Sequence, residues 1–419
     1  MKRALRFFYD RIPGAASAYH FLWAWGGSAA HRDPSKDIFV IGITGTKGKT
    51  TTLQILNAIL EAAGKRTALL SSLRVKIGDE TRKNPTGNSM PGHDYIQKFL
   101  RRAVAAKCEY ALVEVTSQGV AMHRHRFIHW DIGAWTNLSP EHIESHGSFE
   151  NYRAAKLSFL EYVVRRGGAV FLNRDDKKTF PIYERALAAH APVSFSKDDE
   201  HLAQYLDVRT VPAFLLAEFN IANIAAAVAI ARRLGIEPAV IKRALAEFKT
   251  MPGRAEFIEA GPYRAVVDYA HTPDSLEAIY RAAKPKAPGA RLICILGAAG
   301  GGRDVWKRPA MGAIAAKYCD EIILSDEDPY DEKPADIIEQ IARGIREADP
   351  AKHFSIELDR REAIKKAVAF MRPGDVVIGT GKGSEEWIHG THGSKTPWDE
   401  RKVFEEVMKE RLEARDKIA

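Results

Sequence analysis

Apolar and polar positions along the chain predict strands and helices in alternation. Before residue 250, four strand-like apolar runs are each closed by polar or glycine-containing residues: 37–43, 110–115, 131–137 and 168–173. A helical pattern follows the first run from about Thr50, and another lies in NIANIAAAVAIARRLG. This succession predicts stacked βαβ units, and hence an α/β domain with a mostly parallel sheet.

A second alternating series begins after KTMPGR, whose proline and glycine mark a joint. Strand-like runs occur at YRAVVDYA, RLICILG, DEIILSD and DVVIGTG, with helical patterns between them at SLEAIYRAAK, AMGAIAAKY and DIIEQIARGIREA. This series predicts a C-terminal Rossmann-like α/β domain. We therefore expect a short aromatic N-terminal segment (1–36), a central domain (37–250) and a C-terminal domain (251–419).

The size and composition of the chain agree with two folded domains. Its 419 residues exceed the roughly 250 to 300 at which a single hydrophobic core stops growing. Hydrophobic residues at 45% and charged residues at 28% are typical of a globular protein and exclude a disordered one. The formal charge of +8 is spread through the sequence rather than clustered, which favours small phosphorylated substrates over nucleic acid.

The three cysteines indicate a reducing environment. Cys108, Cys294 and Cys319 form no CxxC pair, and three thiols cannot build a disulfide scaffold. We therefore expect a cytoplasmic protein without a structural zinc site.

The segment 1–27 is rich in aromatic residues, but Asp10, Arg11, Pro13 and His20 interrupt it. Nothing there approaches the roughly 20 apolar residues of a membrane span, so we expect neither a span nor a signal peptide. The aromatic side chains are predicted to pack on the protein itself: Phe7, Phe8, Phe21, Trp23 and Trp25. The alternative is a helix on a membrane surface or against a partner, which the absence of a cationic run among the aromatics makes the weaker interpretation.

The stretch TGTKGKTTT lies between the first predicted strand and a helix. Glycines there let backbone N–H groups turn toward phosphate oxygens, and the start of the helix adds positive potential. Lys49 can reach the outer phosphates, and the Thr50 hydroxyl can ligate the Mg²⁺ that bridges them. Although the glycine spacing departs from the general Walker pattern by one residue, these features predict an ATP site rather than a structural turn. Its residues are Gly45, Thr46, Lys47, Gly48, Lys49, Thr50 and Thr51. The central α/β domain is therefore expected to be of the phosphate-loop (P-loop) ATPase type.

Two more polar residues follow predicted strands. Glu114 lies at the carboxyl end of YALVEV and His142 in the polar loop after DIGAWTN, where an open parallel sheet presents ligands. Both can face Mg²⁺. A hydrolase needs a group that positions water, whereas a ligase needs a dry site with a second cation beside the γ-phosphate, and these residues favour the ligase. The alternatives are an ion pair or helix cap for Glu114 and a solvated loop for His142.

The ordered motifs between residue 37 and about residue 390 resemble the Mur ligase superfamily, and within it the members that add the third amino acid to the cell-wall peptide. They include EVTSQG, NLSPEHIESHGSFENYRAAK, EFNIANIAAA, VVDYAHTPDSLE, GGGRDVWKRPAMG and GTGKGSEEW. The resemblance implies ATP-dependent amide formation. A donor carboxylate attacks the γ-phosphate to give an acyl phosphate and ADP, and the amine of an amino acid then expels phosphate. Closure of two domains over the joint at Met251–Arg254 would exclude water.

The resemblance also implies roles for single residues. Lys156, in NYRAAKLSF, would be a carbamylated lysine, in which an anionic oxygen ligand for Mg²⁺ replaces an ammonium group. The implied metal site is Thr50, Glu114, His142 and Lys156, and the implied catalytic set is Lys49, Glu114, His142, Lys156 and Arg254. Further nucleotide contacts would be Asn223, Asp268 and His271.

Contacts with the other two substrates follow from the same resemblance. The implied donor contacts are Asn84, Thr86, Ser117 and Arg124, and the implied acceptor contacts are Arg303, Asp328, Tyr330, Gly381 and Glu385. The donor loop NPTGNSMPG could equally be a turn-rich surface loop. Where the diaminopimelate-adding members have DNPR, this chain has EDPY, so tyrosine replaces the arginine that would hold a distal carboxylate. Diaminopimelate is therefore doubtful, and the acidic loop either attracts a cationic side chain such as that of lysine or is merely solvated.

Only about 36 residues precede the first predicted strand, where full-length relatives carry a domain for the uridine nucleotide. Either the aromatic segment replaces that domain, or the donor is not a UDP-muramyl peptide, as in the two-domain relatives that extend folate. A nucleotide-binding scaffold without turnover is a third alternative, against which the intact set of catalytic residues argues. We expect a monomer.

Overall fold

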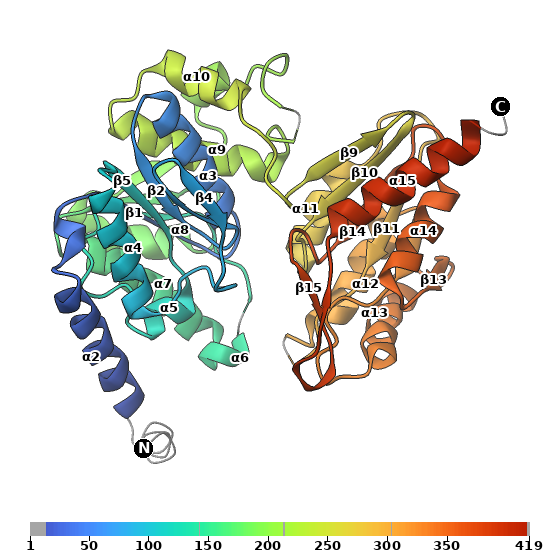
Figure 1. Ribbon diagram of the computed structural model, residues 1–419, viewed down its shortest axis with the longest axis horizontal. Helices are drawn as coiled ribbons and strands as arrows, with labels where there is room; N and C mark the ends of the chain where they lie inside the picture. The colour runs from blue at the N-terminus through green and yellow to red at the C-terminus, as the bar shows by residue number, and fades with distance from the viewer. Residues whose placement is uncertain (1–13, 142, 213, 303, 417–419) are drawn as a thin grey trace. The chain divides into compact units, whose positions relative to one another are not determined.

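The computed structural model describes residues 14–141, 143–212, 214–302 and 304–416. The chain divides into two compact units, Met1–Phe248 and Lys249–Ala419, drawn in blue to yellow-green and in yellow to red in Figure 1. Each unit is built around its own sheet. The α/β class predicted from the alternating pattern is therefore confirmed.

The first unit contains an eight-stranded sheet with the order β4-β3-β2-β5-β1-β6-β7-β8. Its strands are β1 (Phe39–Thr44), β2 (Thr67–Leu70), β3 (Arg74–Ile77), β4 (Glu80–Lys83), β5 (Tyr110–Glu114), β6 (Ile132–Trp135), β7 (Ala169–Asn173) and β8 (Val193–Phe195). All pairs from β2 across to β8 are parallel, whereas β3 and β4 add an antiparallel edge. This is the mostly parallel sheet that the sequence predicted.

Helices cover both faces of this sheet (Figure 1). They are α2 (Ala15–Ala30), α3 (Lys49–Ala62), α4 (His93–Ala105), α5 (Ser117–Ala121), α6 (Ile143–His146), α7 (Phe149–Val164), α8 (Phe180–Leu187), α9 (Glu218–Arg233) and α10 (Pro238–Ala246). Short 3₁₀ turns lie at Pro34–Lys36, Ala188–His190 and Glu200–Tyr205. Helix α3 packs with α9 and α10, and α4 and α7 pack on the opposite face of the central strands.

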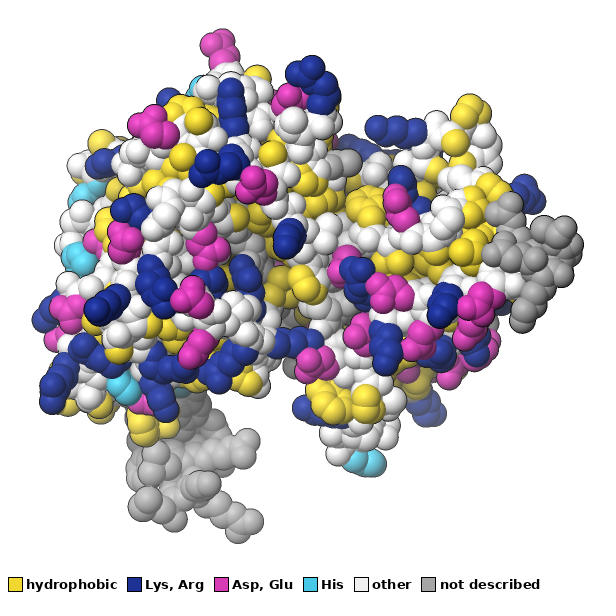
Figure 2. Space-filling model, turned by 45° about the horizontal axis from the view of Figure 1, so that its top comes forward, with side chains coloured by type: hydrophobic (Ala, Val, Ile, Leu, Met, Phe, Trp, Pro, Cys, Tyr) yellow, Lys and Arg dark blue, Asp and Glu magenta, His cyan; other side chains and the backbone are white. Residues whose placement is uncertain are grey.

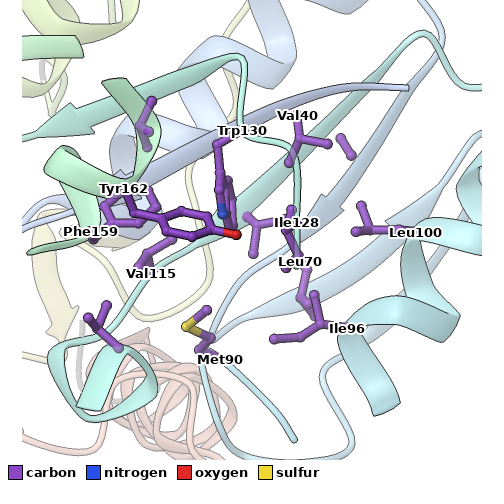
Figure 3. Packing of buried hydrophobic residues seen from close by; sticks show 14 of the residues in the cluster. Val40, Leu70, Met90, Ile96, Leu100, Val115, Ile128, Trp130, Phe159 and Tyr162 are labelled. Atoms are coloured by element: carbon purple, nitrogen blue, oxygen red, sulfur yellow. The ribbon is translucent and has the colours of Figure 1, made fainter. Parts of the chain in front are cut away.

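The core on the α4 and α7 face surrounds an aromatic pair (Figure 3). The indole ring of Trp130 meets the Phe159 ring edge-on at 5.2 Å. A Cβ atom at Gly42 of β1 would lie 2.6 Å from Phe159 and 2.8 Å from Trp130. Only glycine therefore lets these rings lie against the central strand, directly before the phosphate loop.

The second unit contains a six-stranded sheet with the order β13-β12-β11-β14-β10-β9. Its strands are β9 (Glu256–Ala260), β10 (Tyr263–Asp268), β11 (Leu292–Leu296), β12 (Glu321–Leu324), β13 (Phe354–Ile356) and β14 (Val376–Thr380), and β15 (Trp387–His389) pairs with β16 (Lys395–Pro397). The helices are α11 (Pro273–Ala283), α12 (Lys307–Tyr318), α13 (Pro334–Ala348), α14 (Arg360–Phe370) and α15 (Glu400–Asp416), with a 3₁₀ turn at Thr391–Gly393. Within the six-stranded sheet every pair is parallel except β9 with β10, and the separate pair β15–β16 is antiparallel.

One disulfide bond lies inside the second unit, which the sequence analysis did not predict. Cys294 on β11 is bonded to Cys319 at the end of α12, 25 positions later in the chain. Both cysteines are buried, and Cys108 remains a free thiol. Two of three thiols therefore form a cross-link, because β11 and the end of α12 are brought together by a fold that the cysteine spacing does not reveal.

Helix α2 departs from the prediction that the aromatic residues pack on the protein itself. Trp23 is 52% exposed and Trp25 is 57% exposed, so for these two the prediction is wrong. Phe21 contacts the ring of Phe127 at 5.1 Å but is still 41% exposed. Phe7 and Phe8 lie outside the described residues. Among the described residues, no helix is long and apolar enough to cross a membrane.

Candidate active site

The phosphate loop joins β1 to α3 and requires glycine at two positions. Gly45 has φ 148° and Gly48 has φ 81°, both in the region that favours glycine. A Cβ atom at Gly48 would lie 2.1 Å from Oδ1 of Asn223, and one at Gly45 would lie 1.9 Å from Oγ1 of Thr136. The end of β6 holds the loop, since the backbone N–H of Lys47 donates to Asn137 Oδ1 at 2.8 Å. The first turn of α3, which includes the predicted residues Thr50 and Thr51, leaves its N–H groups available for an anion.

Two lysine side chains converge on one carbonyl oxygen of this loop. Lys49 Nζ donates to Gly45 O at 3.0 Å and to Thr46 O at 2.9 Å. Lys156 Nζ, from α7, donates to the same Gly45 O at 2.7 Å. Lys156 is only 2% exposed, and its burial, followed by the charge of Lys49, holds its pKa well below the usual lysine value. Sequence reasoning alone would have assigned this residue to the surface.

A carboxylate and two hydroxyl groups gather beside the loop. Glu114 is the last residue of β5, which lies next to β1 in the sheet. It pairs with Ile43, the second-last residue of β1, and therefore lies close to the start of the phosphate loop. Its Oε2 accepts hydrogen bonds from Thr50 Oγ1 at 2.9 Å and from the Ser72 N–H at 3.0 Å. Thr50 Oγ1 and Ser72 Oγ are 3.0 Å apart. These oxygen atoms are ligands of the type that Mg²⁺ prefers.

Three residues near the loop were missed by sequence reasoning. Besides Ser72, Tyr152 places its OH 2.9 Å from Thr46 Oγ1, and its ring lies 4.6 Å from Lys156 Nζ. Glu141 forms a partly buried salt bridge with Lys47 at 2.7 Å. Although Glu141 and Tyr152 lie within the motif NLSPEHIESHGSFENYRAAK, the motif does not show that their side chains reach the phosphate loop. His142 lies outside the described residues, so its predicted role stays a prediction.

Asn223 lies on α9 and is buried against the phosphate loop. Its Oδ1 accepts a hydrogen bond from Thr52 Oγ1 at 3.3 Å, and its Nδ2 donates to Asn220 Oδ1 at 3.1 Å. Asn220 in turn donates to the carbonyl oxygen of Phe214 at 2.8 Å. The structure thus brings Asn223, a predicted nucleotide contact, next to Gly48 through a network of buried amide groups.

The predicted donor residues lie on two neighbouring loops. Asn84 Oδ1 accepts from the Thr86 N–H at 2.9 Å and from Thr86 Oγ1 at 2.7 Å, and Asn84 Nδ2 donates to Ser71 O at 2.8 Å. Through these hydrogen bonds, the Asn84 side chain stabilises the turn in which it lies. Ser117 Oγ lies 3.1 Å from Nε2 of His146, and Arg124 donates to the carbonyl oxygen of Met90, which follows the Asn84 turn in the chain. The predicted donor residues therefore fall into three groups: the turn of Asn84 and Thr86, the Ser117–His146 pair, and Arg124 bonded to Met90.

In the second unit, the predicted nucleotide contacts gather at the end of β10, with Arg254 reaching it from the segment before β9. The guanidinium group of Arg254 lies over the ring of Tyr269, 4.4 Å from its centroid. Asp268 accepts from the N–H groups of Ala255 at 2.6 Å and Ala270 at 2.7 Å, which fixes the backbone next to Arg254. His271 Nδ1 lies 2.8 Å from the carbonyl oxygen of Tyr269.

The predicted acceptor residues surround a buried lysine that sequence reasoning missed. Lys382 Nζ donates to Asp328 at 2.8 Å and to Glu385 at 2.6 Å. Although burial opposes the ammonium form of Lys382, these two carboxylates raise its pKa. Glu385 also accepts a hydrogen bond from the Tyr269 OH at 3.2 Å. The negative charge of Asp328 is thus already balanced within the protein.

Gly381, Tyr330 and Glu327 complete this region. Gly381 has φ 98°, and a Cβ atom there would lie 2.1 Å from Glu327 Oε2. Burial raises the pKa of Glu327 to about 7, and its Oε2 has no hydrogen-bond partner among the described residues. The Tyr330 ring stacks on His389 with 5.3 Å between centroids. Arg303 lies outside the described residues, so its acceptor contact stays a prediction.

The fold and the loop define a class: a nucleotide-binding enzyme with a phosphate loop on a parallel sheet, joined to a second α/β unit. Family comparisons narrow this class. The Mur ligase middle domain matches residues 43–231, and the Mur ligase, glutamate ligase domain matches residues 253–383. The chain belongs to the Mur ligase family, as its sequence motifs predicted.

Two curated relatives illustrate the similarity. One is the UDP-N-acetylmuramoyl-L-alanyl-D-glutamate--2,6-diaminopimelate ligase of Syntrophomonas wolfei, 34% identical over 90% of this chain and 79% of the relative. The other is the UDP-N-acetylmuramyl-tripeptide synthetase of Deinococcus radiodurans, 34% identical over 96% of this chain and 84% of the relative. The chain is accordingly an ATP-dependent peptide ligase of peptidoglycan synthesis, which forms a carbon–nitrogen bond. This excludes the scaffold alternative.

Solved structures share the fold. A UDP-N-acetylmuramoyl-L-alanyl-D-glutamate--2,6-diaminopimelate ligase superposes with a TM-score of 0.59 at 25% identity, covering 90% of this chain and 79% of that one. Folylpolyglutamate synthase of Mycobacterium tuberculosis superposes with a TM-score of 0.65 at 16% identity, covering 86% of this chain and 92% of that one. The second similarity shows the fold alone.

Proposed function

We propose that this ligase adds an amino acid to the carboxylate of a UDP-muramyl peptide through an acyl-phosphate intermediate. The substrate names of its relatives support the donor, and the phosphate loop supports the use of ATP. The single observation that carries the proposal is the buried Lys156 on the carbonyl oxygen of Gly45, beside Lys49. Binding of a nucleotide does not need a second, deeply buried lysine there.

Different residues of the site would bind the phosphate groups and stabilise the charge that develops during phosphoryl transfer. N–H groups at the start of α3 would hold phosphate oxygens, and Lys49 would swing from the loop carbonyl oxygens to the γ-phosphate. Negative charge builds on the transferring group, so positive groups placed there lower the barrier. Arg254 would add charge from the second unit, where its guanidinium group lies on the Tyr269 ring.

Lys156 would act as a carbamate. Its lowered pKa favours the neutral amine, whose nitrogen lone pair can attack the carbon of CO₂. A nitrogen–carbon bond forms, one proton leaves to solvent, and the side chain changes from a potential cation to an anion. With Glu114 and Thr50, the carbamate oxygens would then hold Mg²⁺. When bound, Mg²⁺ supplies electrostatic neutralisation of the phosphate oxygens.

The acceptor is proposed to be an amino acid with a cationic side chain. Tyr330 offers no positive charge for a distal carboxylate. Asp328 and Glu385 share the ammonium group of Lys382, so two carboxylates face one ammonium group there. A lysine-like substrate would balance the excess negative charge.

A panel of amino acids with UDP-muramyl dipeptide and Mg·ATP tests the proposal. We expect phosphate release and a product heavier by one lysine residue, and neither with Lys49→Ala. Product formation only with a carrier other than UDP, for example a folate, would contradict the donor assignment while leaving the ligase chemistry intact. Preference for diaminopimelate would contradict the acceptor assignment.

A further inference from the structure

A buried arginine in the second unit binds the carboxyl ends of two strands at once. Arg360 is the first residue of α14, which packs with α15 on one face of the second sheet (Figure 1). Its Nη1 donates to the carbonyl oxygen of Asp326 at 3.0 Å, and its Nη2 donates to that of Thr380 at 2.7 Å. Thr380 is the last residue of β14, and Asp326 lies two positions after the end of β12. Because β11 lies between these two strands in the sheet, the guanidinium group joins the ends of strands that are not neighbours.

The charge of Arg360 is balanced by a carboxylate that is equally buried. Glu400, the first residue of α15, accepts from Arg360 Nε at 2.9 Å and from Nη2 at 2.7 Å, and it also accepts from the indole N–H of Trp398 at 2.7 Å. Both side chains of the pair are 0% exposed, whereas many other acidic and basic side chains are interspersed on the surface (Figure 2). A buried ion pair adds little net stability, because the loss of hydration offsets most of the attraction. The geometry that the pair imposes is therefore a better explanation for its presence than stability.

The two strand ends that Arg360 binds lead into predicted acceptor residues. The segment after β12 carries Asp328, and the segment after β14 carries Gly381. The two segments meet where Lys382 Nζ donates to Asp328 Oδ1 at 2.8 Å. They are closely packed, since a Cβ atom at Gly381 would lie 2.1 Å from Glu327 Oε2. A substrate held by two segments depends on their separation, and a misplacement of about 1 Å can lower the rate about a hundredfold.

We propose that Arg360, held by Glu400, is a positioning residue for the amino-acid acceptor. It sets the separation of the segments after β12 and β14, and it rests on the proposed function, which places the acceptor on these two segments. Arg360 would act through the backbone and would not contact the substrate itself. Arginine suits this role because its planar group holds several N–H donors in fixed directions, so that one side chain binds two carbonyl oxygens and a carboxylate.

Steady-state kinetics of the full chain test this proposal, with each of the three substrates varied in turn. The tested variant is Arg360→Met/Glu400→Gln, which removes both charges together and leaves neither buried without its partner. The matched control is Arg291→Met/Asp375→Asn. That pair, with 2.8 Å between Arg291 Nη2 and Asp375 Oδ2, lies just before the starts of β11 and β14, at the opposite end of the same sheet.

We expect the KM for the amino acid to rise about tenfold or more in the tested variant, while the KM values for ATP and the donor change less than about twofold. The control should leave all three KM values at the wild-type level. Arg360→Lys supplies a second test, which also serves if the double variant does not fold. It keeps a positive charge beside Glu400, but its donors share one nitrogen atom and cannot span both carbonyl oxygens, so the KM for the amino acid should rise here too.

Amide hydrogen exchange separates this proposal from the proposed function, because it needs no substrate. Residues 326–330 and 380–385 should exchange faster in the Arg360 variants than in the wild type and the control. Unchanged exchange there, a wild-type KM for the amino acid in Arg360→Lys, or an equal rise in all three KM values would overturn the positioning role. A wild type that forms no product with any amino acid would instead contradict the proposed function, and the exchange rates would still decide whether Arg360 holds the two segments.

Discussion

Replacement of Lys156 by methionine should raise the stability of the protein and lower its kcat. Methionine keeps the length and apolar stem of the side chain but has no amine. Gly45 O keeps its hydrogen bond from Lys49 at 3.0 Å, so no loop carbonyl oxygen is left without a partner. The matched control is Lys47→Met, because Lys47 lies in the same loop but is 29% exposed and paired with Glu141.

The stability effect follows from the lowered pKa of Lys156. The unfolded chain binds a proton up to the ordinary value near 10.5, whereas burial and the charge of Lys49 make the folded protein release it at lower pH. Between the lowered pKa and 10.5, the unfolded state binds more protons, so the free energy of unfolding rises with pH. Lys156→Met removes this slope, and the variant should be more stable than the unmodified wild type at neutral pH.

The activity effect follows from the lost carbamate. Removal of one preorganised electrostatic group from a reaction centre typically lowers kcat by about 10² to 10³, or roughly 3 to 4 kcal/mol. Urea unfolding in CO₂-free buffer over the neutral to alkaline range measures the slope, and phosphate release with added bicarbonate measures kcat. Carbon NMR with labelled bicarbonate should show a carbamate signal in the wild type and none in the variant. A variant that retains activity within a few-fold of wild type, or the same pH slope, would refute the reasoning.

Three further changes test other parts of the structure. Gly48→Ala places a Cβ atom at φ 81°, and we expect ATP affinity in calorimetry to fall about tenfold or more; unchanged affinity would contradict the loop geometry. Cys294→Ala/Cys319→Ala opens a cross-link between positions 25 apart, worth about 3.5 kcal/mol of chain entropy, so Tm of the second unit should fall by roughly 10 °C. A reductant should lower the Tm of wild type only, and equal Tm values would show that the bond contributes nothing. Tyr330→Arg adds a guanidinium group that can hold a distal carboxylate through two hydrogen bonds, so the preference for diaminopimelate in the amino-acid panel should rise about tenfold. An unchanged preference would show that residue 330 does not determine acceptor specificity.

Local sequence signals were sufficient to predict the phosphate loop and the position of the Glu114 carboxylate at the end of a strand. The glycines of the loop are required by backbone conformation, which a short motif encodes directly. Glu114 follows from a rule of parallel sheets, since strands that end at one edge bring their last residues together. Neither conclusion needs knowledge of which distant segments pack against the loop.

Contacts between distant segments could not be predicted in this way. Ser72 lies in a stretch without a distinctive pattern, and Tyr152 and Lys382 lie within motifs that do not show what their side chains contact. Each reaches its partners through the packing of elements far apart in sequence. The Cys294–Cys319 bond depends likewise on where α12 ends relative to β11. The prediction that the tryptophans of α2 are buried failed for another reason. A helix that is apolar all round has no periodicity that would show which of its faces packs against the protein.

The two lysines on Gly45 O link the stability of the fold to its chemistry. Two ammonium groups that both donate to one carbonyl oxygen, at 3.0 Å and 2.7 Å, would repel each other in a buried space. The conflict is relieved when Lys156 gives up its proton, since Lys49 is the less buried of the two. The neutral amine that results is the form that reacts with CO₂, and the carbamate then attracts Lys49 instead of repelling it. The burial that weakens the fold therefore creates the nucleophile, and modification of that nucleophile should restore the stability that the unmodified lysine costs.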